Sequence, residues 1–194
     1  MTAFTENDRP GQFDYIDKRN YTCGDYATEA DAHRHLAQLL DAVGLFTVHH
    51  ELTGLYVHTR EADGEARPRI DYVLEPTETT LAAGWTHGNI GIEVKRSGEK
   101  VGKPLSQMID YRRAGYKTRA GRFIVLDYVC LYPWEGALGG PLLSIETQQH
   151  LGHAYVNPLG HLIVANGKNI ILATKGDRYV IGDPIVSGRR IGRR

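Results

Sequence analysis

The sequence is poor in cysteine, has no long apolar run and carries no excess of either charge. Its two cysteines are too few for a disulfide framework or a four-cysteine iron–sulfur cluster. No signal peptide and no run of about 18 apolar residues is present, so we expect a soluble, cytoplasmic protein with no membrane partner. The 23 basic residues equal the 23 acidic ones in number. This balance argues against a chain that coats nucleic acid with its whole surface, but it allows a local basic groove.

The length of 194 residues predicts one domain. Residues 1–26 are polar and irregular, which is typical of an N-terminal arm. We expect the core over 27–134 and a β-rich extension of the same domain over 135–186. Residues 187–194 form a basic tail that contains four arginines. Such a tail is either a phosphate-binding segment or an ordinary basic terminus.

The hydrophobic patterns of the core predict a mixed α/β fold. Leucines recur at helical spacing before a glycine stop signal, and several short apolar runs alternate like strands. The predicted elements in chain order are a helix over 28–43, a β-rich run over 45–59, a strand near 71, an extended hairpin loop over 77–89, a strand near 93, a helix from 104 and a strand over 123–132.

The last third of the chain reads as a β-meander. Asn166-Gly167-Lys168-Asn169 is a strong hairpin signal between apolar runs at 161–165 and 170–174, and 178–181 can add a third strand. This meander can complete the sheet, form a dimer contact or hold a DNA strand. Completion of the sheet is the simplest of these roles.

A carboxylate and an amine lie two residues apart in the run Ile90-Gly91-Ile92-Glu93-Val94-Lys95. The isoleucines and the valine alternate with the other residues, which is the pattern of a strand with one face in the core. Glu93 and Lys95 should therefore project from the same face, about 6 to 7 Å apart. A Glu-x-Lys pair is also common on solvated strands, so the pair alone indicates little.

Asp71 lies in a second apolar run that can pair beside the first and bring its carboxylate to Glu93. Two carboxylates at one point repel each other unless a cation separates them, and oxygen ligands suit Mg²⁺ or Mn²⁺. A lysine beside such an ion can orient a water or stabilise charge on a phosphate under attack.

The next helix carries Gln107 and Tyr111 on one face, at i and i+4. The ordered set Asp71, Glu93-x-Lys95 and Gln107-x-x-x-Tyr111 resembles the PD-(D/E)XK nuclease superfamily, and the Gln-x-x-x-Tyr helix is similar to that of its RecB-like branch. The resemblance implies a restriction-endonuclease-like core with the order helix, three strands, helix and strand, in which helices flank a mixed central sheet.

The resemblance also implies a role for each residue. Asp71, Glu93 and the backbone carbonyl of Val94 would bind Mg²⁺, with Mn²⁺ as a substitute, and Lys95 would act on the water. Gln107 and Tyr111 would support the lysine or touch the DNA backbone.

A residue of the first helix can join the metal site. Glu29 lies on the inward stripe of that helix, seven residues before Leu36, and His33 lies beside it. A glutamate in a first helical turn can also serve only the helix dipole. His33 is nearer to the family's spacing before the glycine, so the choice between Glu29 and His33 stays open.

Five basic residues near the site can line a local DNA groove, although a solvated surface explains such residues equally well. They are Arg96, Lys100, Lys103, Arg112 and Arg113.

The leading hypothesis is a Mg²⁺-dependent deoxyribonuclease, with endonuclease preferred to exonuclease. The alternative is a nuclease-like fold that only binds nucleic acid or protein. A histidine-based metal hydrolase is disfavoured, because adjacent histidines such as His49 and His50 point to opposite faces of a strand and no H-E-x-x-H helix occurs. A homodimer would suit cleavage of two strands, and nothing in the sequence demands one.

Overall fold

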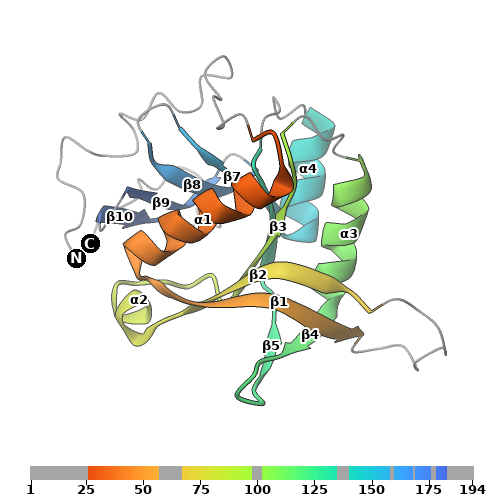
Figure 1. Cartoon of the computed structure of the whole chain (residues 1–194), viewed down its shortest axis with the longest axis horizontal. Helices are drawn as coiled ribbons and strands as arrows, with labels where there is room; N and C mark the ends of the chain where they lie inside the picture. The colour runs from red at the N-terminus through yellow and green to blue at the C-terminus, as the bar shows by residue number, and fades with distance from the viewer. Residues whose placement is uncertain are drawn as a thin grey trace.

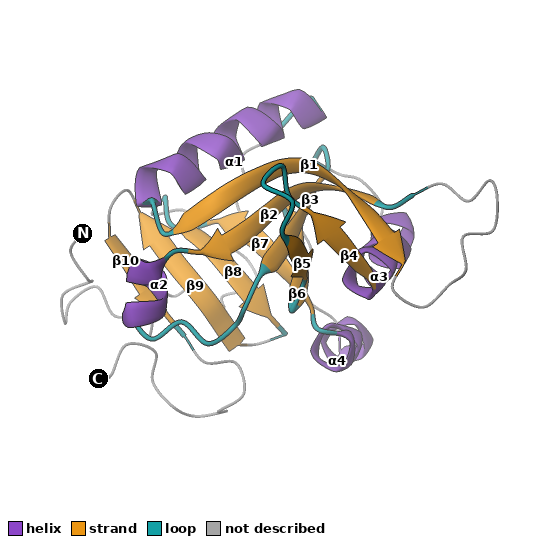
Figure 2. Cartoon of the chain, turned by 90° about the horizontal axis from the view of Figure 1, so that it is seen from below, coloured by secondary structure: helices purple, strands orange, loops and turns teal. Residues whose placement is uncertain are grey.

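A mixed sheet with helices on both of its faces forms the fold (Figures 1 and 2). The computed structural model describes residues 26–56, 67–97, 102–134, 140–157, 160–167, 169–175 and 178–182. Within these ranges the helices are α1 (Glu29–Val43), α2 (Glu78–Ala82), α3 (Gly102–Arg113) and α4 (Gly140–Gln149). The strands are β1 (Phe46–Tyr56), β2 (Arg69–Pro76), β3 (Ile90–Val94), β4 (Ala114–Lys117), β5 (Phe123–Val125), β6 (Tyr128–Tyr132), β7 (Leu151–Val156), β8 (Leu162–Asn166), β9 (Asn169–Lys175) and β10 (Arg178–Ile181).

The sheet has the strand order β10-β9-β8-β7-β6-β3-β2-β1-β4-β5. The pairs β3·β6 and β6·β7 are parallel, and the other neighbouring pairs are antiparallel. The crossovers that parallel pairing requires contain α3 and α4. The expected mixed α/β class is therefore confirmed. Among the helices of the described ranges, none is long and apolar enough to cross a membrane.

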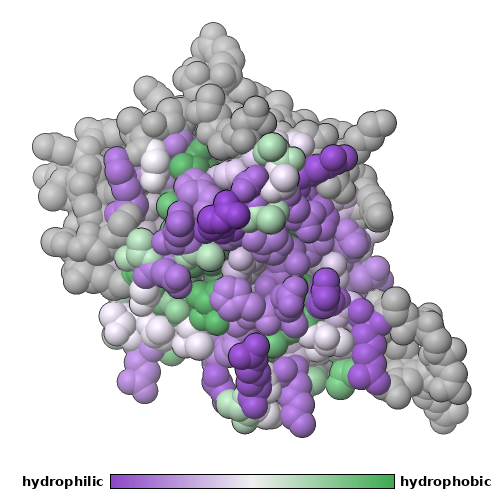
Figure 3. Space-filling view, in the orientation of Figure 1, coloured by the Kyte–Doolittle hydropathy of each residue, from purple (hydrophilic) through white to green (hydrophobic). Residues whose placement is uncertain are grey.

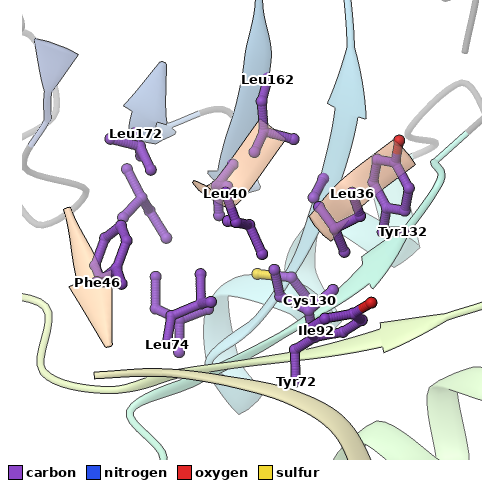
Figure 4. Close-up of a cluster of buried hydrophobic side chains, with 14 of the residues drawn as sticks. Leu36, Leu40, Phe46, Tyr72, Leu74, Ile92, Cys130, Tyr132, Leu162 and Leu172 are labelled. Carbon is purple, nitrogen blue, oxygen red and sulfur yellow. The ribbon is translucent and has the colours of Figure 1, made fainter. Parts of the chain in front are cut away.

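Helix α1 begins and ends where its sequence signals predict. The Thr28 side chain accepts a hydrogen bond from the backbone N–H of Asp31, and Gly44 adopts φ 58° while its N–H donates to the carbonyl of Leu40. Leu36 and Leu40 pack against the sheet in the cluster shown in Figure 4. Burial of each leucine contributes roughly 1.5 to 3 kcal/mol, which fixes the helix across this face. The surface over the helix is mainly hydrophilic (Figure 3).

Helices α3 and α4 lie on the opposite face of the sheet from α1 (Figure 2). Met108 and Tyr111 of α3 belong to a second buried cluster, together with Val129 and Leu131 of β6. The central strands are therefore covered on both faces, as the burial of all five residues of β3 indicates.

Two sequence predictions were wrong in detail. The run 123–132 is not one strand, because it breaks after Val125 and the Asp127 N–H donates to the carbonyl of Asn89. Its halves pair differently, β5 with β4 and β6 with β3. The connection over 77–89 is not an extended loop, because Thr77 caps the short helix α2 by accepting a hydrogen bond from the Thr80 N–H.

The C-terminal meander is present as β8, β9 and β10, and it extends the central sheet through β7. Strand β7, strand β4 and helix α4 were not predicted. The basic tail over 187–194 and most of the arm over 1–26 lie outside the described residues.

The regular alternation of side chains between the two faces of the sheet is interrupted at one point along β1 and β2. The rings of His50 and Tyr72 are in contact on the α1 side of the sheet, whereas Leu52 and its partner Ile70 pack into the cluster on the α3 side. Residues two apart on a regular strand share a face, so the alternation is interrupted between these pairs. Glu51, which lies at this level, has φ 50°. Asp71 of β2 lies at the same level, between Ile70 and Tyr72.

Candidate functional site

Strands β2 and β3 separate at the level of Asp71 and Glu93. Their Cα partners are Leu74 with Ile90, Val73 with Gly91 and Tyr72 with Ile92, and the pairing ends there. Continuing this register would place Asp71 opposite Glu93. Instead of a backbone carbonyl, Asp71 Oδ2 accepts the hydrogen bond of the Val94 N–H, at 2.7 Å. The side chain of Asp71 thus occupies the gap between the strands.

Glu93 is buried, and one of its two carboxylate oxygens has no hydrogen-bond partner among the described residues. The residue is 3% exposed, and its Oε1 accepts a hydrogen bond from Lys95 Nζ at 2.5 Å. Its Oε2 is buried and has no hydrogen-bond partner among the described residues. Burial, and then the charge of Asp71, raises the pKa of Glu93 to about 7. An unpartnered oxygen on a carboxylate of raised pKa is the state in which a cation would be most stabilising.

Lys95 lies among acidic groups. Burial alone would lower the pKa of Lys95, but the hydrogen bond and charge of Glu93, followed by the charges of Glu29 and Asp71, raise it above its ordinary value. The predicted proximity of Glu93 and Lys95 is present in the structure as an ion pair.

The segment around Lys95 is tied to its neighbours by backbone hydrogen bonds. The Lys95 N–H donates to the carbonyl of Tyr132 at 2.8 Å, which continues the pairing with β6. Tyr26, just before α1, donates its N–H to Ser97 Oγ at 2.9 Å, and its carbonyl accepts the Ser97 N–H at 3.3 Å. The start of α1 and the end of β3 are therefore joined directly beside the lysine.

The two residues predicted on α3 both direct polar groups into the interior. Tyr111 is 6% exposed, and burial followed by the charges of Glu93 and Asp71 raises the pKa of its phenol. Gln107 has a buried Oε1 that lacks a hydrogen-bond partner in the described part of the chain. Tyr111 thus lies beside the carboxylates, while no hydrogen bond links Gln107 to Lys95 within those residues.

Helix α1 brings both of its candidate residues to the site. Glu29 is exposed, and its charge acts on Lys95. His33 Nε2 lies 3.9 Å from Asp71 Oδ2. Tyr72 donates its hydroxyl to the carbonyl of His33, so the same hydroxyl can accept from His33 Nδ1 at 3.1 Å. The ring of His33 is thereby oriented with Nδ1 toward Tyr72 and Nε2 toward Asp71.

The residues present fit a small divalent cation. No group of three His, Cys, Asp or Glu side chains in the described ranges is arranged to hold a metal. The two convergent carboxylates offer oxygen atoms, and Oε2 of Glu93 has no hydrogen-bond partner within the described part of the chain. Magnesium is commonly held by one or two carboxylates with water in its remaining positions, so this donor set matches that ion. The Val94 carbonyl is the adjacent backbone oxygen.

The predicted DNA-binding residues differ in their surroundings. Arg96 and Arg113 are exposed. Arg112 is half-buried and donates its Nε–H to the carbonyl of Asp127 at 3.0 Å, so part of its guanidinium holds the fold together. Lys100 lies outside the described residues, and so does the side chain of Lys103.

The sequence patterns did not reveal two residues beside Asp71. Glu51 lies across from Asp71 in the β1–β2 register and has a positive φ. Arg69 is exposed at the start of β2, and its charge offsets a small part of the rise that burial and the two carboxylates cause in the pKa of the Tyr111 phenol. The only available signal for Arg69 was its place two residues before Asp71.

The chain matches no protein-family model, no curated protein and no solved structure.

Proposed function

We propose that the chain is a Mg²⁺-dependent deoxyribonuclease with a restriction-endonuclease-like core. The observation that carries the proposal is the convergence of Asp71 and Glu93 where β2 leaves β3, with a buried Glu93 oxygen that lacks a partner among the described residues. Like charges are seldom buried together without a purpose, because each raises the cost of ionising the other. The motif order on the two strands and on α3 supports phosphodiester hydrolysis as that purpose.

Each residue has a distinct role in the proposed reaction. Asp71 and Glu93, with the Val94 carbonyl, would hold the ion, which when bound supplies Lewis-acid stabilisation of phosphate charge. Lys95 orients the attacking water and stabilises negative charge on the phosphate. The water oxygen bonds to phosphorus as the bond to the leaving sugar oxygen breaks, one water proton passes to solvent, and the leaving oxygen takes up a proton.

Tyr111 contributes a hydroxyl that stays protonated, since its pKa is raised above the ordinary value. It can therefore donate a hydrogen bond to a carboxylate or to a phosphate oxygen throughout the neutral range. A neutral donor at this position lowers the negative charge density around Glu93 without adding a further cation. The endonuclease form of the activity is our preference, with exonuclease and a binding-only module as the alternatives.

Incubation with supercoiled plasmid, linear duplex and single-stranded DNA, in Mg²⁺, Mn²⁺ or chelator, tests the proposal. We expect nicking of the closed circle in Mg²⁺ or Mn²⁺ but not in chelator. Attack on free ends alone would indicate an exonuclease, and retention of DNA without cleavage in either metal would indicate the binding module.

Matched variants assign the activity to this site. Glu93→Gln and Lys95→Met should each lower the cleavage rate by about 100-fold or more, because they remove charge that acts on the transition state. Glu78→Gln removes an exposed carboxylate at the start of α2 and should leave the rate unchanged. Full cleavage by both site variants would refute the proposal.

A further inference from the structure

Arg69 and Thr53 form an exposed polar pair at the end of the β1–β2 ribbon. They are Cα partners in the antiparallel register, and both side chains are exposed. Directly paired residues project from the same side of a sheet with Cβ atoms about 4.5 to 5.5 Å apart. A guanidinium and a hydroxyl are thus presented together to solvent.

The guanidinium of Arg69 has no hydrogen bond or ion pair with any residue of the described ranges. Two exposed arginines elsewhere in the fold are engaged, since Arg34 pairs with Asp31 and Arg122 pairs with Glu75. An arginine has five N–H donors in a fixed planar fork, which is suited to two oxygens of one anion. As far as the described residues show, the fork of Arg69 is therefore available to a ligand.

The pair lies next to the site described above. Arg69 precedes Asp71 by two residues, and the β1–β2 pairing continues to Arg69 beyond the level at which β2 leaves β3. The charge of Arg69 also acts on the phenol of Tyr111, on which the charges of Asp71 and Glu93 act as well. A DNA strand bound with one phosphate at Asp71 and Glu93 would therefore pass this pair.

We propose that Arg69 and Thr53 bind a phosphate of the DNA strand that flanks the phosphate to be cleaved. The fork of Arg69 donates to the two non-bridging oxygens of this phosphate, and the hydroxyl of Thr53 donates to one of the same two oxygens. Lys95 already lies at the carboxylates, whereas Arg69 is exposed at the outer end of the ribbon, so a neighbouring phosphate is the natural ligand. This inference rests on the proposed nuclease function.

The binding is electrostatic and independent of base sequence. Phosphate contacts fix the register of a strand but do not read bases. Because the flanking phosphate does not change during the reaction, its contact stabilises bound substrate and transition state alike. Loss of such a contact raises KM with little change in kcat.

The test compares Arg69→Ala, Arg69→Lys and Thr53→Val with Arg119→Ala, which removes an exposed cation at the β4–β5 turn. The substrate is a labelled duplex cleaved in Mg²⁺ over a series of salt concentrations, and thermal unfolding confirms that each variant is folded. Arg69→Ala should raise KM about tenfold, keep kcat within about threefold and lower the salt dependence of kcat/KM by about one phosphate contact. Arg69→Lys should keep the salt dependence with a partial rise in KM, because a lysine retains the charge but not the fork.

Thr53→Val should raise KM severalfold without changing the salt dependence, and Arg119→Ala should change neither quantity. If folded Arg69→Ala cleaves with the KM and salt dependence of the parent chain, the inference is wrong while the proposed function stands. A drop in kcat without a rise in KM would also overturn it. If the parent chain cleaves no DNA in Mg²⁺ or Mn²⁺, the proposed function fails and the inference falls with it.

Discussion

The backbone N–H of Val94 donates to the carboxylate of Asp71, at 2.7 Å, where a strand carbonyl would normally accept. This one bond joins β2 to β3 beyond the last pair of their ladder. Asp71 therefore has two roles in the molecule. It closes the sheet at the gap, and it brings an acidic group to Glu93.

Two substitutions of Asp71 should separate its structural role from its role in the proposed reaction. Asp71→Asn keeps an oxygen that can accept from Val94, whereas Asp71→Ala leaves the buried N–H without a partner. An unsatisfied buried donor costs about 1 to 3 kcal/mol, so the alanine variant should be less stable than the asparagine variant by that amount in urea unfolding. Both variants should lose the cleavage activity. Equal stability of the two would show that the bond to Val94 contributes nothing.

The second prediction concerns how the contribution of Glu93 to stability changes with pH, measured with a chelator present so that no divalent cation is bound. Its pKa is raised from 4.5 to about 7 in the folded chain, so the folded state binds the proton more tightly than the unfolded state. Stability contributed by the neutral form is fully present below about pH 4.5 and is lost as pH rises through 7, on the order of 3 kcal/mol in total.

Glu93→Gln should consequently be more stable than the parent chain at pH 8 and nearly equal to it at pH 4.5, as measured by urea unfolding. The amide mimics the neutral acid and removes repulsion with Asp71. Glu78→Gln should follow the parent chain at both values. A Glu93→Gln variant that is no more stable than the parent chain at pH 8 would contradict the assigned repulsion.

The third prediction tests the backbone at Glu51. A non-glycine residue at φ 50° is disfavoured by roughly 1 to 2 kcal/mol, and glycine adopts this conformation freely. Glu51→Gly should therefore raise the unfolding free energy by about 0.5 to 1 kcal/mol, after the entropic cost of glycine in a strand. Glu51→Ala, which keeps the Cβ atom, should not raise it, and a gain as large as that of glycine would point to the charge instead.

The fourth prediction places an acid-sensitive group in the C-terminal meander. Burial, and then the charge of Lys175, lowers the pKa of His161 from 6.5 to about 4. The neutral ring is held at Asn157, whose Oδ1 lies 3.2 Å from His161 Nδ1. A lowered histidine pKa means that stability present above pH 6.5 is lost as pH falls to 4, on the order of 3 kcal/mol.

His161→Gln should weaken this acid sensitivity, as measured by thermal unfolding between pH 7 and pH 4. His50→Gln removes an exposed imidazole on β1 and serves as the control. If both variants lose stability with acid as steeply as the parent chain, other groups account for the effect.

Local signals in the sequence accounted for part of the fold. Helix α1 was predictable because a capping threonine, a leucine stripe and a terminal glycine all mark it. The break between β5 and β6 was not predictable, since it depends on a hydrogen bond between Asp127 and Asn89, which are 38 residues apart. Helix α4 carries its apolar residues mostly in its first half, so its pattern lacks a helical period.

The candidate site was likewise predictable only in part. Alternation along 90–95 predicted that Glu93 and Lys95 would project from the same face, and in the structure they form an ion pair. The positions of Glu51 and Arg69 beside Asp71 depend on the pairing of β1 with β2 and on the interrupted alternation of these strands. The position of Glu51 cannot be obtained from spacing along one strand, and the signal for Arg69 was only its place two residues before Asp71.

Asp71 and Glu93 should also affect the order in which the strands form during folding. Strands β2 and β3 are antiparallel and close in sequence, whereas β3 meets β6 only across a crossover that contains α3. Shorter loops close at lower entropic cost, so we expect the β2–β3 hairpin to form first. Asp71 and Glu93 would then repel each other before the helices cover them, and a divalent cation present during refolding should speed the formation of this hairpin.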